Sequence, residues 1–382
     1  MEMERKNLIV NIGSTSKKYA LYFEKELVRF TLNNDLTGKY KVNGNWFEIK
    51  IKSTDYLHSV NFIIDFLIKN YFITTKNEIS KIAVRIVSPG VYFQKHRLID
   101  STFISKLKTS LDMAPLHIKP ALEEINMLKK EFPKIKMYGI SDSEFHSSLP
   151  DVTKYYGISK KHSDNLQIYR YGYHGISIRS VLRIVNEKLG KVPERIIVCH
   201  LGGGCSITAI KNSKSLDTSM GFTPLDGMIM STRSGILDPS VVNYLSKTLK
   251  LNSDKIEEML NNQSGLLGIS GSESSVKELL KKSNENSKLA IDKFVYDIVK
   301  FVSSYYSILN GLDLIVFTGA IGAESVKIRK VVCDSLNCLG IFIDDEKNLD
   351  NNNFLQDKKS RVKILALETD EISEMNLILK EF

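Results

Sequence analysis

The sequence predicts a two-domain α/β protein, and three observations support that fold class. First, the 382-residue chain is longer than a single hydrophobic core usually supports. Second, short apolar runs alternate with segments that have the apolar spacing of helices, which indicates helices layered on mixed sheets. Third, the pattern of a strand, a turn of small residues and a second strand occurs twice, about half the chain apart, which indicates a duplicated domain.

The two strand–turn–strand segments have the same layout. Residues 7–11 form a short apolar run that enters a Gly/Ser/Thr turn, and residues 18–23 leave it as a second strand. Residues 195–201 enter three consecutive glycines at 202–204, and residues 206–210 follow as the outgoing strand. Glycines let a backbone approach an anion without interference from side chains, so we interpret each turn as a phosphate-sized loop.

Further strands and helices continue the alternation. Apolar or β-branched runs predict strands at residues 7–11, 82–87, 136–140, 196–201 and 314–318. Helical apolar spacing is found at residues 59–70, 118–131, 176–189, 288–309 and 325–336. A proline interrupts the pattern near residues 149–153, so we expect domains at residues 1–150 and 151–367. The polar segment at residues 348–359 is predicted to be a solvated loop before the last strand.

The composition is that of an ordinary soluble globular protein, with 42% hydrophobic and 25% charged residues. The net charge of +9 comes from scattered lysines, which favours a solvated surface over a nucleic-acid site. The four cysteines show no metal or disulfide spacing. The sequence has no signal-peptide pattern and no long apolar run. We therefore expect a cytoplasmic protein that binds neither nucleic acid nor a membrane.

Residues 198–240 combine two features that phosphoryl transfer needs. The first is the run of glycines, whose amides can point at a phosphate. The second is Arg233, in the short polar loop at residues 231–235, because a planar guanidinium can stabilise negative charge that spreads during transfer. A triple glycine alone is more often a tight turn than a phosphate site, so the surrounding motifs decide the interpretation.

Those motifs resemble the acetate kinase family in seven segments that occur in the family's order. They are NIGSTSKKY at residues 11–19, APLH at 114–117, SDSEFH at 141–146, RYGYHG at 170–175, the run from DTSMGFTPLDG to STRSG at 217–235, VFTGAIG at 316–322 and TDE at 369–371. The resemblance implies two duplicated ribonuclease H-like (actin-like ATPase) domains with a ligand cleft between them. It also implies that the final helix, at about residues 368–382, joins the first domain.

The activity that this resemblance implies is a reversible, Mg²⁺-dependent transfer of the terminal phosphoryl group of ATP to acetate. The products are acetyl phosphate and ADP, the transfer is direct and in line, and Mn²⁺ is an alternative metal. A homodimer is also implied. Three alternatives stay open: a kinase for propionate or another short-chain carboxylate, an enzyme of this fold with a different phosphoryl donor, and a binding protein that has lost turnover.

The motif matches also imply roles for individual residues. The catalytic candidates are Arg85, Asp142, His174 and Arg233. The candidates for the acyl substrate pocket are Arg85, Val87, Leu116, Tyr173 and Pro224. The nucleotide candidates are Lys18, His200, Leu201, Gly202, Gly203, Gly204, Ser275, Val276, Lys277, Gly319, Ala320, Ile321, Gly322 and Ala323. The metal candidates are Asn11 and Glu371. Independently of the resemblance, an arginine inside the apolar run at residues 82–87 would be costly unless it faced an anion or a partner.

Several positions depart from the family pattern. Tyr173 stands where the family usually has phenylalanine, and its hydroxyl could narrow the pocket or bond elsewhere. Ser275 and Lys277 replace an aspartate and an arginine that belong to the nucleotide site, which leaves the phosphoryl donor open. Small residues at 319–323 leave space for an adenosine and so favour ATP over a phosphate-only donor. Asp142 could orient an arginine or take part in proton and magnesium chemistry.

Overall fold

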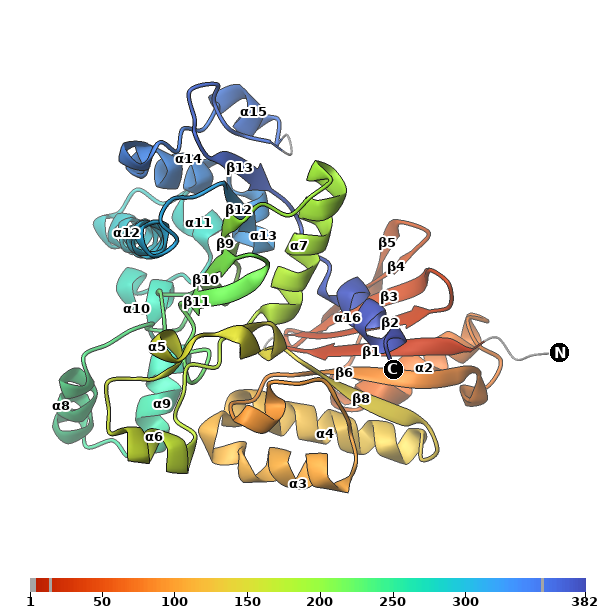
Figure 1. Cartoon of the computed structure of the whole chain (residues 1–382). Coiled ribbons are helices and arrows are strands. Elements are labelled where there is room, and N and C mark those ends of the chain that lie inside the picture. The colour runs from red at the N-terminus through yellow and green to blue at the C-terminus, as the bar shows by residue number, and fades with distance from the viewer. Residues whose placement is uncertain (1–4, 14–15, 352–353) are drawn as a thin grey trace. The chain divides into compact units, whose positions relative to one another are not determined.

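The computed structural model describes residues 5–13, 16–351 and 354–382, and the chain divides into two compact units (Figure 1). Unit 1 comprises Met1–Glu144 and Asp370–Phe382, and unit 2 comprises Phe145–Thr369. The sequence placed the boundaries at residue 150 and near residue 368. Residues 145–150 group with unit 2, where His146 is hydrogen-bonded to Ser215 Oγ and to the carbonyl of Tyr173.

Unit 1 is built on an eight-stranded mixed sheet in the order β5-β4-β3-β2-β1-β6-β8-β7. Strands β1 to β5 form an antiparallel meander, β6 and β8 run parallel to β1, and β7 is antiparallel to β8. The strands are β1 (Lys6–Ile12), β2 (Ser16–Tyr22), β3 (Glu26–Asn33), β4 (Thr37–Val42), β5 (Asn45–Lys50), β6 (Ile79–Ile86), β7 (Arg97–Leu98) and β8 (Lys136–Ser141). The helices are α1 (Ser53–Leu57), α2 (Ser59–Lys69), α3 (Ser101–Thr109), α4 (Pro115–Glu131) and α16 (Glu371–Lys380), with 3₁₀ turns η1 (Lys76–Glu78), η2 (Val91–Phe93) and η3 (Leu111–Met113).

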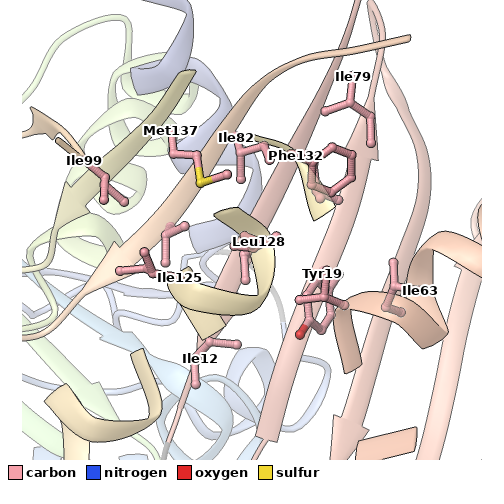
Figure 2. Close-up of a cluster of buried hydrophobic side chains, with 14 of the residues drawn as sticks. Ile12, Tyr19, Ile63, Ile79, Ile82, Ile99, Ile125, Leu128, Phe132 and Met137 are labelled. Atoms are coloured by element: carbon pink, nitrogen blue, oxygen red, sulfur yellow. The ribbon is translucent and has the colours of Figure 1, made fainter. Parts of the chain in front are cut away.

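The core of unit 1 lies between this sheet and helices α2 and α4 (Figure 2). Ile125 and Leu128 of α4 pack with Ile82 of β6 and Met137 of β8. Successive side chains of a strand point to opposite faces of the sheet, so every second residue of β1 points to the face opposite this core. There α16 packs against β1, β6 and β8, with Asn7 donating to Asn376 Oδ1 at 3.1 Å. The final helix therefore belongs to unit 1.

Unit 2 contains a five-stranded sheet in the order β11-β10-β9-β12-β13. Strands β9, β10 and β11 form an antiparallel meander, and β12 and β13 are parallel to β9. The strands are β9 (Arg195–Leu201), β10 (Cys205–Lys211), β11 (Lys214–Thr218), β12 (Leu314–Thr318) and β13 (Lys363–Ala366). One face is covered by α7, whose Ile178, Val181 and Val185 pack on the sheet, while α12 packs on β9 and β10.

The helices of unit 2 vary from single turns to long rods. They are α5 (Asp151–Lys154), α6 (Lys160–Leu166), α7 (Gly175–Leu189), α8 (Pro239–Leu249), α9 (Ser253–Asn262), α10 (Gly265–Ser270), α11 (Val276–Leu279), α12 (Glu285–Ile308), α13 (Gly319–Glu324), α14 (Val326–Ser335) and α15 (Asp345–Leu349), with the 3₁₀ turn η5 (Asn337–Leu339). A further 3₁₀ turn, η4 (Glu144–Ser148), spans the boundary between the units. Across the described ranges, no helix is both long and apolar enough to cross a bilayer.

The predicted secondary structure agrees with these elements in most places. The five predicted helices correspond to α2, α4, α7, α12 and α14, and the two predicted strand pairs correspond to β1–β2 and β9–β10. Ser14 and Thr15, in the first turn, lie outside the described residues.

The predicted loop at residues 348–359 is wrong at its start. Asn348 is the fourth residue of α15 and is buried, because its side chain and carbonyl are hydrogen-bonded to a buried arginine, Arg329. Asp344 caps that helix by accepting from Lys347 N. Polar composition alone cannot reveal such a tertiary partner.

Candidate functional site

Arg85 is the centre of a polar cluster in unit 1. It projects from β6, between β1, which carries Asn11, and β8, which leads into Asp142. Its guanidinium makes a two-pronged contact with Asp142, at 3.2 Å from Nε to Oδ1 and 2.9 Å from Nη2 to Oδ2. Because β1, β6 and β8 are parallel, their carboxyl ends meet at one edge of the sheet and bring these three residues together.

Glu371 completes this cluster from the first turn of α16. Its Oε2 accepts from Asn11 Nδ2 at 2.9 Å and lies 3.6 Å from Arg85 Nη1. Arg85 Nη1 also donates to Asn11 Oδ1 at 3.3 Å. Asp370, which caps α16, is held by an ion pair with Arg29 at 2.7 Å. The helix start that carries Glu371 is therefore anchored to β3.

The charges of this cluster support one another. Burial disfavours the charged form of Arg85, but the carboxylates of Asp142 and Glu371 outweigh that effect and raise the pKa of Arg85 above its usual value. The side chain of Asp142 is only 1% exposed, and its carboxylate forms an ion pair with the guanidinium at 2.9 Å. The pair therefore keeps a positive group at the strand ends, with the Nε–Nη2 edge of its guanidinium fixed by two hydrogen bonds.

Oxygen donors in the same cluster fit a small hard cation. Asn11 Oδ1 and the Glu371 carboxylate lie next to each other, with the Asp142 carboxylate on the other side of Arg85. Within the described residues, no group of three or more His, Cys, Asp or Glu side chains could hold a metal. Amide and carboxylate oxygens are ligands that Mg²⁺ accepts, a few at a time and together with several waters.

The other predicted residues of unit 1 are on β2, after β6 and at the start of α4. Lys18 is exposed on β2 and is paired in register with Asn11. Val87 directly follows β6 and is half-buried, and Leu116, in the first turn of α4, is 37% exposed. Lys18, predicted as a nucleotide residue, therefore belongs to the same unit as the metal candidates.

A second cluster, in unit 2, forms where β9 ends. The rings of His174 and His200 stack with centroids 4.1 Å apart. His174 Nδ1 lies 3.0 Å from Ser206 Oγ, and a Cβ placed on Gly204 would lie 3.4 Å from both His174 Nε2 and Arg233 Nη1. The glycine turn, the histidine and the arginine, which are far apart in the sequence, are thus neighbours in space.

Backbone contacts fix the loop that carries Arg233. Its carbonyl accepts from Met230 N at 3.1 Å, and Ser234 N donates to Leu260 O at 2.9 Å. Gly265, which has a φ of 61°, packs so closely that a Cβ there would lie 2.6 Å from Arg233 O. The loop is therefore supported by backbone contacts, and Arg233 Nη1 is directed toward the glycine turn.

The predicted acyl-pocket residues of unit 2 are Tyr173 and Pro224. Tyr173 is hydrogen-bonded to the loop that contains Pro224. Tyr173 is 1% exposed, and its hydroxyl donates to Phe222 O at 2.7 Å. Thus the hydroxyl that the usual phenylalanine lacks is used to anchor this loop. Arg170 binds the same segment through the carbonyls of Thr218 and Ser219.

Sequence reasoning gave no role to His146, Arg170 or Tyr156. His146 is fully buried and fixes the carbonyl of Tyr173, next to the left-handed His174 at φ 62°. Tyr156 accepts from Phe222 N at 2.7 Å. His146 and Arg170 lie inside motifs that match the family, and this position was the signal that could have identified them. Their hydrogen-bond partners are far away in the sequence and could not be predicted from it.

The nucleotide candidates separate into two groups. Gly319, with a φ of 74°, packs so tightly that a Cβ would lie 2.5 Å from Leu201 O, which joins residues 319–323 of α13 to the end of β9. Residues 275–277 instead begin α11, which packs on α12. There Ser275 Oγ accepts from Glu278 N to cap the helix, and Lys277 is exposed.

Comparisons with known proteins agree over nearly the whole chain. The model of the Acetokinase family matches residues 6–376. The acetate kinase of Clostridium acetobutylicum is 36% identical over 386 residues, with 96% of each chain covered. A propionate kinase structure from Francisella tularensis subsp. tularensis SCHU S4 matches with a TM-score of 0.90 at 35% identity, covering 97% of this chain and 98% of that one. The acetate kinase structure from Porphyromonas gingivalis matches at 0.85 and 30%, covering 99% of both. The predicted fold class is therefore confirmed.

Proposed function

Because the chain belongs to the acetokinase family, we propose that it transfers the terminal phosphoryl group of ATP to acetate, giving acetyl phosphate and ADP. The observation that carries this proposal is the preservation of both cationic clusters. Arg85 is braced by Asp142 and Glu371, and Arg233 lies with His174 at the glycine turn. Phosphoryl transfer to a carboxylate brings several anions together, so it needs placed cations more than it needs a strong base.

In unit 1, Arg85 would bind the acceptor carboxylate or the group in transfer. Asp142 binds the Nε–Nη2 edge of its guanidinium through two hydrogen bonds, which fixes the plane of the donor fork. A carboxylate acceptor is already ionised at neutral pH, so it needs no base to remove a proton. We therefore assign Asp142 the role of orienting Arg85.

The oxygen atoms of Asn11 and Glu371 would hold Mg²⁺, or alternatively Mn²⁺. The bound ion would supply neutralising charge to the phosphates of the nucleotide. Lys18 lies across the strand pair from Asn11 and would add a further positive charge for a phosphate. Two protein ligands, Asn11 and Glu371, are enough for such an ion, because Mg²⁺ usually keeps several of its waters.

In unit 2, Arg233 and His174 would stabilise the charge that spreads over the phosphoryl group during an in-line transfer. The amides of residues 202–204 would bind the nucleotide phosphates, with His200 stacked behind His174. Residues 319–323 would border the adenosine, since Gly319 packs on the backbone of Leu201 at the end of β9, next to the glycine turn. Residues 275–277 would lie at the outer part of the nucleotide site.

Propionate is the second candidate substrate, and the similarity to a propionate kinase structure favours it over longer acids. A narrow apolar pocket distinguishes acids that differ by one methylene by only about 1–3 kcal/mol. We place acetate first because of the acetate kinase relatives. The homodimer and the cytoplasmic location implied by the family stay predictions.

The direct test is a hydroxamate assay of purified protein with Mg²⁺, ATP and, in separate reactions, acetate, propionate and butyrate. We expect acyl phosphate from acetate, less from propionate and least from butyrate. Reactions without ATP, and reactions with pyrophosphate in its place, are the controls for the donor. No acyl phosphate from any of the three acids with ATP would rule out the proposal, and product with pyrophosphate alone would select the alternative donor.

The Tyr173→Phe variant tests whether the loop anchor influences the choice of acid. Loss of the hydrogen bond to Phe222 O should lower the free energy of unfolding by about 1 kcal/mol and change the acetate-to-propionate ratio of kcat/KM several-fold. Tyr171→Phe is a matched control, because Tyr171 is equally buried and donates to the carbonyl of Gln167. The control should lose similar stability and keep the ratio. An unchanged ratio in Tyr173→Phe would show that the anchor has no part in specificity.

A further inference from the structure

Arg329, on α14, is a buried arginine with unusual partners. It is 0% exposed. Its guanidinium makes five hydrogen bonds: to Asn348 Oδ1 and O, Asn351 Oδ1, Gly322 O and Ala323 O. All five acceptors are neutral, and within the described part of the chain no carboxylate forms an ion pair with it. Burying a charge without an ionic partner costs free energy, so we ask which interaction of Arg329 offsets that cost.

Two of these acceptors explain why the charge is tolerated. Gly322 O and Ala323 O belong to the last turn of α13, at 3.0 Å and 2.6 Å from Arg329 Nη1. The last carbonyls of a helix lack partners within the helix and carry partial negative charge. Arg329 therefore caps the carboxyl end of α13. Burial lowers the pKa of Arg329, yet an arginine stays charged at any physiological pH.

The amino end of α13 is packed against backbone atoms, because a Cβ on Gly319 would lie 2.5 Å from Leu201 O. Gly322, in the same six-residue helix, lies close to the carbonyl carbon of Phe317. The helix is thus held by backbone contact with β9 and β12 and, at its carboxyl end, by Arg329. Asn348 and Asn351 brace the guanidinium from the far side.

We propose that Arg329 is a positioning residue for the adenine nucleotide, which acts by fixing α13 beside the glycine turn. This inference rests on the proposed function, because residues 319–323 are there assigned to the adenosine. Arg329 itself touches no reacting atom. Without it, α13 would lose its carboxyl-end contacts, and the surface offered to the nucleotide would shift while Arg233 and His174 keep their own supports.

The test is calorimetric titration of the protein with ADP and Mg²⁺, which measures nucleotide binding without turnover. Arg329→Lys keeps the charge but cannot reproduce the planar fork, so ADP should bind about tenfold more weakly. The KM for acetate should stay within about twofold and kcat at saturating ATP within about threefold, because only nucleotide binding is changed.

Two control variants separate this role from general destabilisation. Lys330→Met removes a neighbouring positive charge of α14 that pairs with Asp334 and Asp345, and it should leave ADP binding unchanged. Val185→Ala truncates a buried side chain of the same unit, so it should lower the melting temperature without weakening ADP binding. Asn351→Gly removes one brace at a residue whose φ of 51° glycine tolerates, and it should weaken ADP binding about twofold.

Wild-type ADP affinity in a folded Arg329→Lys protein would overturn the proposal. Equal losses of ADP and acetate parameters would also overturn it, because they would mark a purely structural role. If Arg329→Lys does not fold, unchanged ADP binding in Asn351→Gly gives the same negative answer. A wild-type protein that binds ADP but makes no acyl phosphate would contradict the proposed function and leave this inference standing.

Discussion

Arg233→Ala is expected to lower kcat at least about a hundredfold while the protein stays folded, because one arginine can supply that much stabilisation in phosphoryl transfer. The loop at residues 231–235 is held by backbone hydrogen bonds and by Gly265, so it should survive loss of the side chain. Steady-state kinetics with ATP and acetate measure the effect, and the melting temperature reports on the fold.

Two further variants sharpen this prediction. Arg233→Lys keeps the charge without the planar fork and should recover only part of the lost turnover. Arg183→Ala is a control in the same unit, because Arg183 pairs with Glu187 on the exposed side of α7. It should leave kcat unchanged. Near-normal turnover in Arg233→Ala would remove Arg233 from the proposed mechanism.

Arg85→Ala is expected to lower kcat/KM for acetate by about a thousandfold and also to destabilise unit 1. The variant removes the donor fork for the acceptor and leaves the buried Asp142 carboxylate without its partner. Breaking a buried pair in this way typically costs about 3–5 kcal/mol. The measurements are kcat/KM for acetate and unfolding by denaturant, made on the same preparation.

A double-mutant cycle separates the two effects of Arg85. If Asp142 acts by orienting Arg85, then Arg85→Ala combined with Asp142→Asn should cost less than the sum of the single changes, by about 1–3 kcal/mol in the transition-state term. Lys6→Met is the matched control: Lys6 and Glu78 form another largely buried pair of unit 1, so its loss should lower stability and spare kcat/KM. Additive losses in the cycle would show that Asp142 works independently of Arg85.

Much of the fold could be predicted because its elements are amphipathic in the ordinary way. Helix α12 and strands β9 and β12 are marked by apolar residues at the spacing that buries one face or both. Among the elements that were not predicted, the short edge strand β7 and the single-turn helices α11 and α15 have two to five residues, which carry too little periodicity. These elements depend on their neighbours.

The sequence by itself determined the family and which residue types are available for chemistry, because the motifs around Asn11, His174 and Arg233 are local strings that can be compared position by position. Only the tertiary structure decided what each residue touches. Glu371 meets Asn11 from the far end of the chain, the Tyr173 hydroxyl is used on Phe222, and Arg329 caps α13. The physical reason is that hydrogen-bond partners are set by packing, which joins segments whose separation along the chain carries no signal.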